Sequence, residues 1–121
     1  MPPDYRLFLA DMRQCCEKVT RYTTGYTFDQ FTSDDKTLDA VMRNRAIIGE
    51  AVKQLPEDLR NRHPGVEWRK IARFRDLAIH HYFAVDEQIV WDIVQNHIPQ
   101  LAAQLEQIIR IESATDPGTS P

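Results

Sequence analysis

Apolar residues recur every three or four positions in four stretches of this chain, and this spacing constrains the fold more than any other feature. It is the period of an amphipathic α-helix, and no stretch alternates convincingly with the two-residue period of a strand. The four apolar stripes are Tyr5, Phe8, Met12, Cys15, Val19 and Tyr22; Leu38, Val41, Met42, Ile48, Val52 and Leu55; Trp68, Ile71, Phe74 and Ala78; and Val90, Ile93, Val94, Leu101, Leu105 and Ile108. The sequence therefore predicts an all-α protein.

The first and second helices are separated by a polar segment. Gly25 ends the first apolar pattern, and "YTFDQFTSDD" (residues 26–35) follows it. We expect this segment to be a connection in which Asp29 and Ser33 are available as helix caps.

The second and third helices are expected over residues 37–55 and 67–79. Pro56 suits the first turn of a short helix, "PEDLRNRH", between them. Pro64-Gly65 then breaks the chain.

The last helix is expected to begin at Asp86, which is a good N-cap. Pro99 removes one backbone hydrogen bond, so the helix should kink near Gln95 and Asn96. Every connection is short, and short connections between amphipathic helices predict an antiparallel bundle, here of four to five helices.

The chain of 121 residues is expected to form one domain over residues 1–112, followed by a disordered tail, "SATDPGTSP", over residues 113–121. No apolar run approaches the roughly 18 residues that cross a bilayer, and the N-terminus does not resemble a signal peptide. A cytoplasmic protein without a membrane partner is therefore expected. Cys15 and Cys16 are adjacent, which disfavours a disulfide, so both should be reduced.

Positive charge is concentrated in one part of an acidic chain. The net charge is −3, yet residues 42–75 hold nine Lys and Arg against four Asp and Glu. Such a segment can attract phosphates locally. The alternative is a solvated helix face.

A polar cluster interrupts the apolar pattern in "RFRDLAIHHYF" (residues 73–83). Arg75 lies on the core side of a regular helix, so it should face either an acid or an anion-binding cleft. Asp76 and His80 share a face. Arg75 and His80 lie about 140° apart, so they converge only if the helix ends or loosens near His80, or if a second subunit supplies one of them.

These residue types suit the cleavage of a phosphodiester bond without a metal ion. A histidine can move a proton from a ribose 2′-hydroxyl or to the leaving oxygen. Arginine offers a fork of donors to the charge that develops on the phosphate. Asp76 could orient the imidazole of His80, and Tyr82 could bond a nucleotide or be modified. The alternative is a cluster that only complements the dipole at a helix C-terminus.

Other candidate sites are weaker. His80 and His81 are adjacent and lack a third ligand at helical spacing, so no metal site and no cofactor are expected. His97 falls in the last apolar stripe and is expected to be a core histidine, and His63 is expected in a loop. Trp68 and Trp91 are expected to belong to the core.

The sequence resembles the HepT-like family of the HEPN superfamily of helical ribonucleases. The resemblance covers about residues 5–108 and is carried by "DMRQCCEKVTRYTTGYTFDQFTSDDKTLDAV", "RNRAIIGEAVKQLP", "PGVEWRKIARFRDLAIHHYFAVD" and "VW…IPQLAAQL". The most specific element is the R-x4-H-x-Y motif, which matches Arg75, His80 and Tyr82.

The resemblance implies a HEPN-like bundle that forms a homodimer with the two motifs facing each other. It implies a metal-independent endoribonuclease toxin of a type II/VII-like toxin–antitoxin pair that acts on cellular RNA. The implied partner is an MNT-type nucleotidyltransferase antitoxin, which silences the toxin by AMP transfer to Tyr82. In this scheme Arg75, His80 and Asp76 are the catalytic residues.

Three residues have an open role in that scheme. Glu50 matches the acid of the family's "IIGEA" and lies away from the main apolar stripe, so it could serve a second interface. Arg45 stands where the family usually has an apolar residue; it could pair with an acid, widen a basic cleft or lie at a dimer surface. His81 also satisfies the looser superfamily spacing and competes with His80 as the catalytic histidine.

Two functions of other classes remain open. The first is a non-catalytic module that binds nucleotide or docks a nucleotidyltransferase. The second is a structural dimerisation domain whose polar cluster only fixes helix ends. The complete set of Arg75, His80 and Tyr82 favours the enzyme, because a docking domain has no evident need for all three.

Overall fold

The chain folds into a helical bundle in a computed structural model that describes residues 4–80 and 86–114, with the backbone alone at 76–80 and 114. The elements are α1 (Tyr5–Thr23), α2 (Phe28–Ser33), α3 (Asp35–Lys53), α4 (Glu57–Arg62), α5 (Trp68–His80), α6 (Glu87–Asp92), a π-helical turn (Ile93–His97) and α7 (Ile98–Ala114). The described residues contain no strand. The prediction of an all-α bundle is therefore confirmed.

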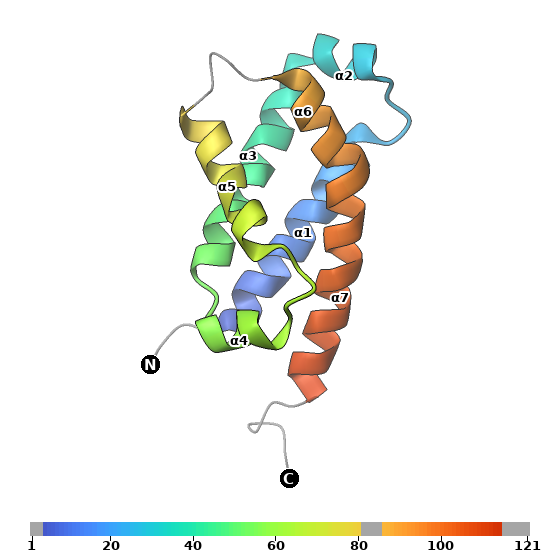
Figure 1. The fold of residues 1–121 in the computed structure, drawn as a ribbon. Coiled ribbons are helices and arrows are strands. Elements are labelled where there is room, and N and C mark those ends of the chain that lie inside the picture. Colours follow the sequence, from blue (N-terminus) through green and yellow to red (C-terminus); the bar gives the residue numbers. More distant parts are fainter. Residues whose placement is uncertain (1–3, 81–85, 115–121) are drawn as a thin grey trace.

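Four helices form the body of the bundle and run alternately up and down (Figure 1). α3 packs against both α1 and α5, and α1 also packs against α7. The short helices α4 and α2 lie at opposite ends (Figure 1). Among the described residues no helix is long and apolar enough to cross a membrane.

The segment between α1 and α3 is more ordered than the sequence predicted. We expected a connection there, and the structure has the helix α2. Its N-cap is Thr27, which accepts from the Gln30 backbone while the Gln30 side chain accepts from the Thr27 backbone. Asp34 caps α3 by accepting from the backbone of Thr37. The caps are therefore Thr27 and Asp34, and not Asp29 and Ser33.

The predicted helix ends agree elsewhere with the structure to within two residues. Gly25 follows α1 with a φ of 79°, which only glycine adopts without strain. Asp86 caps α6 by accepting from the Gln88 and Ile89 backbones. α7 continues to Ala114, and residues 115–121, where most of the predicted tail falls, lie outside the described residues.

Where a kink was predicted before Pro99, the structure has a π-helical turn. It spans Ile93–His97, so it contains both Gln95 and Asn96. The backbone nitrogen of Ile98 donates to the carbonyl of Ile93, five residues earlier. Proline has no N–H to continue the α-helical ladder, and the wider turn lies directly ahead of it.

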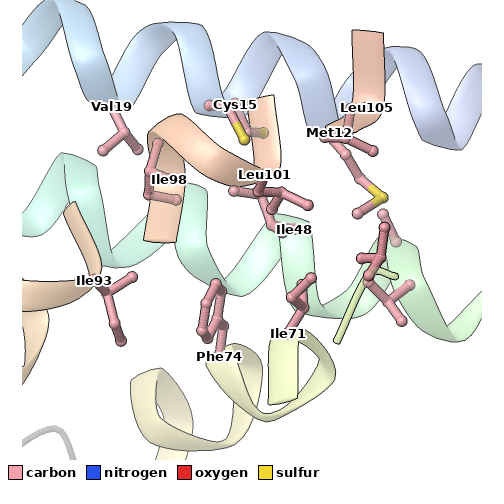
Figure 2. Close-up of a cluster of buried hydrophobic side chains, with 14 of the residues drawn as sticks. Met12, Cys15, Val19, Ile48, Ile71, Phe74, Ile93, Ile98, Leu101 and Leu105 are labelled. Carbon is pink, nitrogen blue, oxygen red and sulfur yellow. The ribbon is translucent and has the colours of Figure 1, made fainter. Parts of the chain in front are cut away.

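The core lies where the four apolar stripes meet (Figure 2). Met12, Cys15 and Val19 of α1 face Ile48 of α3, together with residues of α5, the π turn and α7. Both cysteines are free and buried, and burial raises the pKa of the Cys16 thiol to about 12. Cys16 therefore behaves as a small apolar residue.

Candidate active site

The described part of the predicted polar cluster, residues 75–80, lies on the second half of α5. The backbone remains α-helical through His80, the last residue of that helix. Positions 75 and 80 are therefore about 140° apart around the helix and about 7.5 Å apart along it. The side chains of Asp76 and His80, and all of His81 and Tyr82, lie outside the described part of the structure. Their roles stay predictions.

Arg75 faces an acid, which was one of the two environments expected for it. Its Nε lies 2.7 Å from Oε2 of Glu50 on α3. The two side chains remain 37% and 50% exposed, respectively. We call these two residues the Arg75 pair. Glu50, whose role was open, thus holds the arginine of the motif while leaving it accessible to a ligand.

A close helix crossing brings the Arg75 pair together. A Cβ atom at Gly49 would lie 2.6 Å from the backbone nitrogen of Arg75 and 3.0 Å from the carbonyl oxygen of Ala72. These are backbone atoms, so no side chain can move aside to make room. Only glycine allows α3 and α5 to approach this closely, and the approach places Glu50 beside Arg75.

Arg45 is buried beneath the motif helix. Its side chain has no exposed surface, and its guanidinium carbon lies 5.1 Å from the centre of the Phe74 ring. Nη1 donates to the sulfur of Met42, whereas Nε and Nη2 have no hydrogen-bond partner among the described residues. Burial lowers the pKa of Arg45 to about 10, so the group remains charged at neutral pH.

Among the side chains that the structure describes, the environment of Arg45 matches none of the three that we considered. Within residues 4–75 and 86–113, whose side chains are described, no acid pairs with it, and its burial excludes both a dimer surface and an open cleft. The guanidinium stacks on Phe74 as a cation–π contact, which partly offsets the cost of burying the charge. Its link to the candidate site runs through Phe74, the neighbour of Arg75.

A second polar cluster, which sequence reasoning missed, joins the ends of three elements. Glu112 of α7 is 3% exposed and accepts from Tyr5 at 3.1 Å and from Arg62 Nη2 at 2.8 Å. Nε2 of His63 lies 2.8 Å from its other oxygen. We call these four residues the Glu112 cluster. His63 therefore belongs to a buried network and is not simply a loop residue.

The Glu112 cluster keeps a nearly buried carboxylate charged. Burial alone would raise the pKa of Glu112, but the hydrogen bonds from Arg62, His63 and Tyr5 outweigh it and lower the pKa to about 2. Burial and the bond to Glu112 together raise the pKa of Tyr5. All these bonds are internal, so the cluster stabilises the fold.

The remaining sequence candidates have structural roles. Trp68 is buried and donates from its indole nitrogen to the carbonyls of Arg60 and His63. Trp91 packs against the core and lies 5.0 Å from the ring of Phe31.

His97 was predicted to be a core histidine, and this prediction is wrong. Its side chain is 29% exposed and lies 3.5 Å from the carboxylate of Asp92. The π-helical turn moves His97 off the apolar stripe that a regular helix would give it. Among the residues the structure describes, no three His, Cys, Asp or Glu side chains gather as a metal site.

The described residues thus form an all-α bundle in which the partly exposed Arg75 lies on α5 and pairs with Glu50 of α3. The family description "Ribonuclease HepT-like" matches residues 12–108, and the chain belongs to this HepT-like ribonuclease family. No solved structure matches the chain significantly.

Curated relatives match most of the chain. The protein of Methanocaldococcus jannaschii named "Putative RNase MJ0127" is 46% identical over 107 residues, which cover 88% of each chain. The "Probable ribonuclease HepT" of Thermococcus cleftensis is 38% identical over 108 residues, which cover 89% of this chain and 98% of that protein.

Proposed function

We propose that this protein is a metal-independent endoribonuclease toxin that cleaves cellular RNA. The observation that carries the proposal is the Arg75 pair. Glu50 lies 2.7 Å from the arginine of the family motif, yet the Arg75 side chain keeps more than a third of its surface exposed. An arginine held in this way is ready to bind an RNA phosphate.

The chemistry follows from the residue types. One histidine, His80 or its neighbour His81, takes the proton of a ribose 2′-hydroxyl, whose oxygen attacks the adjacent phosphorus. The bond from phosphorus to the 5′-oxygen breaks, and the protonated histidine gives its proton to that oxygen as it leaves. The products are a 2′,3′-cyclic phosphate and a 5′-hydroxyl. Arg75 stabilises the negative charge on the phosphate during the reaction.

The helical geometry supports a homodimer. Because α5 is helical from Trp68 to His80, positions 75 and 80 of one chain lie on different sides of the same helix. A second copy whose α5 faces the first would let the arginine and histidine of the two chains act on one phosphate.

Silencing by a nucleotidyltransferase antitoxin is the regulatory part of the proposal. The phenol oxygen of Tyr82 would attack the α-phosphorus of ATP, pyrophosphate would leave, and AMP would stay on the tyrosine. A phosphodiester two residues from His80 repels an RNA phosphate, so the modification would block the substrate.

Cleavage of purified RNA tests the proposal. Wild type, Arg75→Ala, His80→Ala and the control Arg13→Ala would be incubated with total cellular RNA in EDTA. Arg13 is a suitable control because it is exposed on α1, outside the motif. We expect new RNA ends from wild type and the control, and cleavage reduced about 100-fold or more in both motif variants.

Two further measurements make the result decisive. A substrate with 2′-deoxyribose at the cut position should resist cleavage, because the attacking hydroxyl is missing. The intact mass of each protein would show that Tyr82 carries no AMP. A folded, unmodified wild type that cuts no RNA would contradict the nuclease and favour a non-catalytic module that binds nucleotide or docks a nucleotidyltransferase.

A further inference from the structure

An open groove of about 950 Å³ lies on α3 and α5, the two helices that carry the Arg75 pair. It is lined by the end of α3, by α4, by the connection before α5 and by the first half of α5. Its charged lining residues are five bases and two acids: Lys53, Arg60, Arg69, Lys70, Arg73, Glu57 and Glu67. We call it the basic groove.

Three arginines of the basic groove have no counter-ion among the side chains that the structure describes. Arg69 and Arg73 are exposed and one helical turn apart on α5. Within the described part of the chain, neither they nor Arg60 forms an ion pair, and Nε of Arg60 is buried without a hydrogen-bond partner. The acid Glu67 lies 3.8 Å from Lys70, and exposed pairs of this kind are weak.

The fold also explains the basic segment seen in the sequence. Of the nine Lys and Arg in residues 42–75, five line the basic groove. Three others are engaged elsewhere: Arg45 under Phe74, Arg62 with Glu112, and Arg75 with Glu50. A uniformly solvated helix face would not gather the remaining charges around one concave surface.

The basic groove and the motif share the helices α3 and α5. Lys53 lies one turn beyond Glu50 on α3, and Ala72, which lines the groove, lies about one turn before Arg75 on α5. Arg69 and Arg75 are about 9 Å apart along the helix axis.

We propose that the basic groove binds the sugar–phosphate backbone of the RNA strand next to the scissile phosphate. This proposal rests on the proposed function, since it assigns the RNA to the same site. The groove contributes affinity and position through phosphate contacts, and these contacts carry no sequence information. Arg60, Arg69 and Arg73 are its principal donors, because the planar guanidinium matches phosphate oxygens.

RNA binding measured without cleavage tests the proposal. The full chain carrying His80→Ala would be titrated into a fluorescein-labelled single-stranded RNA of about 20 nucleotides, and anisotropy recorded at several salt concentrations. Arg69→Gln/Arg73→Gln would be added to that background. The matched control is Arg13→Gln/Arg110→Gln, which removes the same two charges from exposed positions on α1 and α7.

The groove variant should bind RNA about tenfold more weakly than its background. Its slope of log affinity against log salt should be shallower by about 1.4, because two single-strand phosphate contacts are lost. The control should change affinity less than about twofold. Equal weakening in both variants would overturn the proposal, since diffuse attraction would explain it. Unchanged binding in the groove variant, or no binding by the background, would also overturn it.

The same variants separate this proposal from the nuclease. A wild type that binds RNA through Arg69 and Arg73 but never cuts it leaves the groove standing and contradicts the proposed function. A wild type that cuts RNA, with binding indifferent to Arg69 and Arg73, contradicts the groove alone. If these arginines are needed for a nucleotidyltransferase but not for RNA, the surface binds an acidic protein and the proposal fails.

Discussion

Glutamate pairs with arginine in two regions of this bundle, at nearly equal distances but in opposite surroundings. Glu112 and Arg62 approach to 2.8 Å, and Glu50 and Arg75 approach to 2.7 Å. Glu112 is 3% exposed and is also bonded to Tyr5 and His63, whereas Glu50 is 50% exposed. The contact distance therefore does not distinguish a buried pair from an accessible one.

The two carboxylates differ in whether their bonds are closed off from solvent or remain accessible to it. The Glu112 cluster joins α1, α4 and α7 by bonds that are all internal, and desolvation makes each of them costly to break. The Arg75 pair spans α3 and α5 and stays in contact with solvent, where an ion pair adds little stability. The first region should therefore govern folding and the second activity.

Removing Glu112 should have the largest effect on stability. Glu112→Ala leaves His63 and Tyr5 without their acceptor, and breaking a buried charge network typically costs about 3–5 kcal/mol. Because Arg62 is 46% exposed and can be hydrated, we expect a loss of about 3 kcal/mol. Urea unfolding would measure it.

Glu106→Ala is the matched control for that measurement. Glu106 lies on the same helix, α7, and is exposed, so its removal should change stability by less than about 0.5 kcal/mol. If Glu112→Ala were as stable as this control, the Glu112 cluster would not stabilise the fold, and the claimed difference between the two regions would be wrong.

The pH dependence of stability should reveal the Glu112 cluster without disrupting its shape. The pKa of Glu112 lies at about 2 in the fold against an ordinary 4.5. A lowered carboxyl pKa stabilises the fold above the ordinary pKa, and this stability is lost as the pH falls through 4.5 toward 2. The lowered pKa contributes roughly 3 kcal/mol to the free energy of unfolding at neutral pH.

Comparison with Glu112→Gln isolates this contribution, because the other carboxyl groups titrate alike in both proteins. The difference in unfolding free energy between wild type and variant should be constant from about pH 7 to about pH 5 and then shrink with acid. A constant difference down to about pH 3 would mean that Glu112 titrates normally.

Adding one methyl group at Gly49, where α3 meets the backbone of α5, should disturb the Arg75 pair. Gly49→Ala would place a Cβ 2.6 Å from the Arg75 backbone nitrogen, so α3 and α5 must separate. Overpacking of this kind costs about 2 kcal/mol. RNA cleavage should fall about tenfold as Arg75 moves away from Glu50, and both the melting temperature and the cleavage rate would be measured.

Gly65→Ala provides the reference for that substitution, since a Cβ there meets nothing within 4 Å. Gly65 lies in a turn, whereas Gly49 is helical, where alanine with free space would be favoured over glycine by about 1 kcal/mol. A Gly49→Ala protein that is more stable than wild type and fully active would therefore show that the close crossing does not position Arg75.

The sequence predicted local features well, because helix period and caps depend on neighbouring residues. The four apolar stripes, the stop at Gly25 and the cap at Asp86 are all of this kind. α2 was missed although Thr27 and Gln30 show the three-residue spacing of a capping box. That signal was present and could have found the helix.

The contacts between helices could not be predicted in the same way. The Glu112 cluster unites residues from three distant parts of the chain, and nothing in the local pattern pairs them. Arg45 was recognised as a charge where the family usually has an apolar residue, but its contact with Phe74 depends on how α3 meets α5. Glu50 and Arg75 were both candidates, and their pairing follows from the crossing at Gly49.

Removing Glu50 should have the smallest effect on stability and thus provides the sharpest contrast with Glu112. Glu50→Ala breaks a half-exposed ion pair, so the unfolding free energy should fall by less than about 1 kcal/mol. Cleavage should fall about tenfold because Arg75 loses its anchor, while Glu50→Gln should retain more activity because its amide oxygen can still accept from Nε.

Urea unfolding and cleavage rates of the two variants would be measured side by side. If both variants lost cleavage as completely as Arg75→Ala, Glu50 would itself act on the RNA and the anchoring role would be wrong. If Glu50→Ala instead lost as much stability as Glu112→Ala, the half-exposed pair would stabilise the fold as strongly as the buried one, and the proposed difference between the two pairs would be wrong.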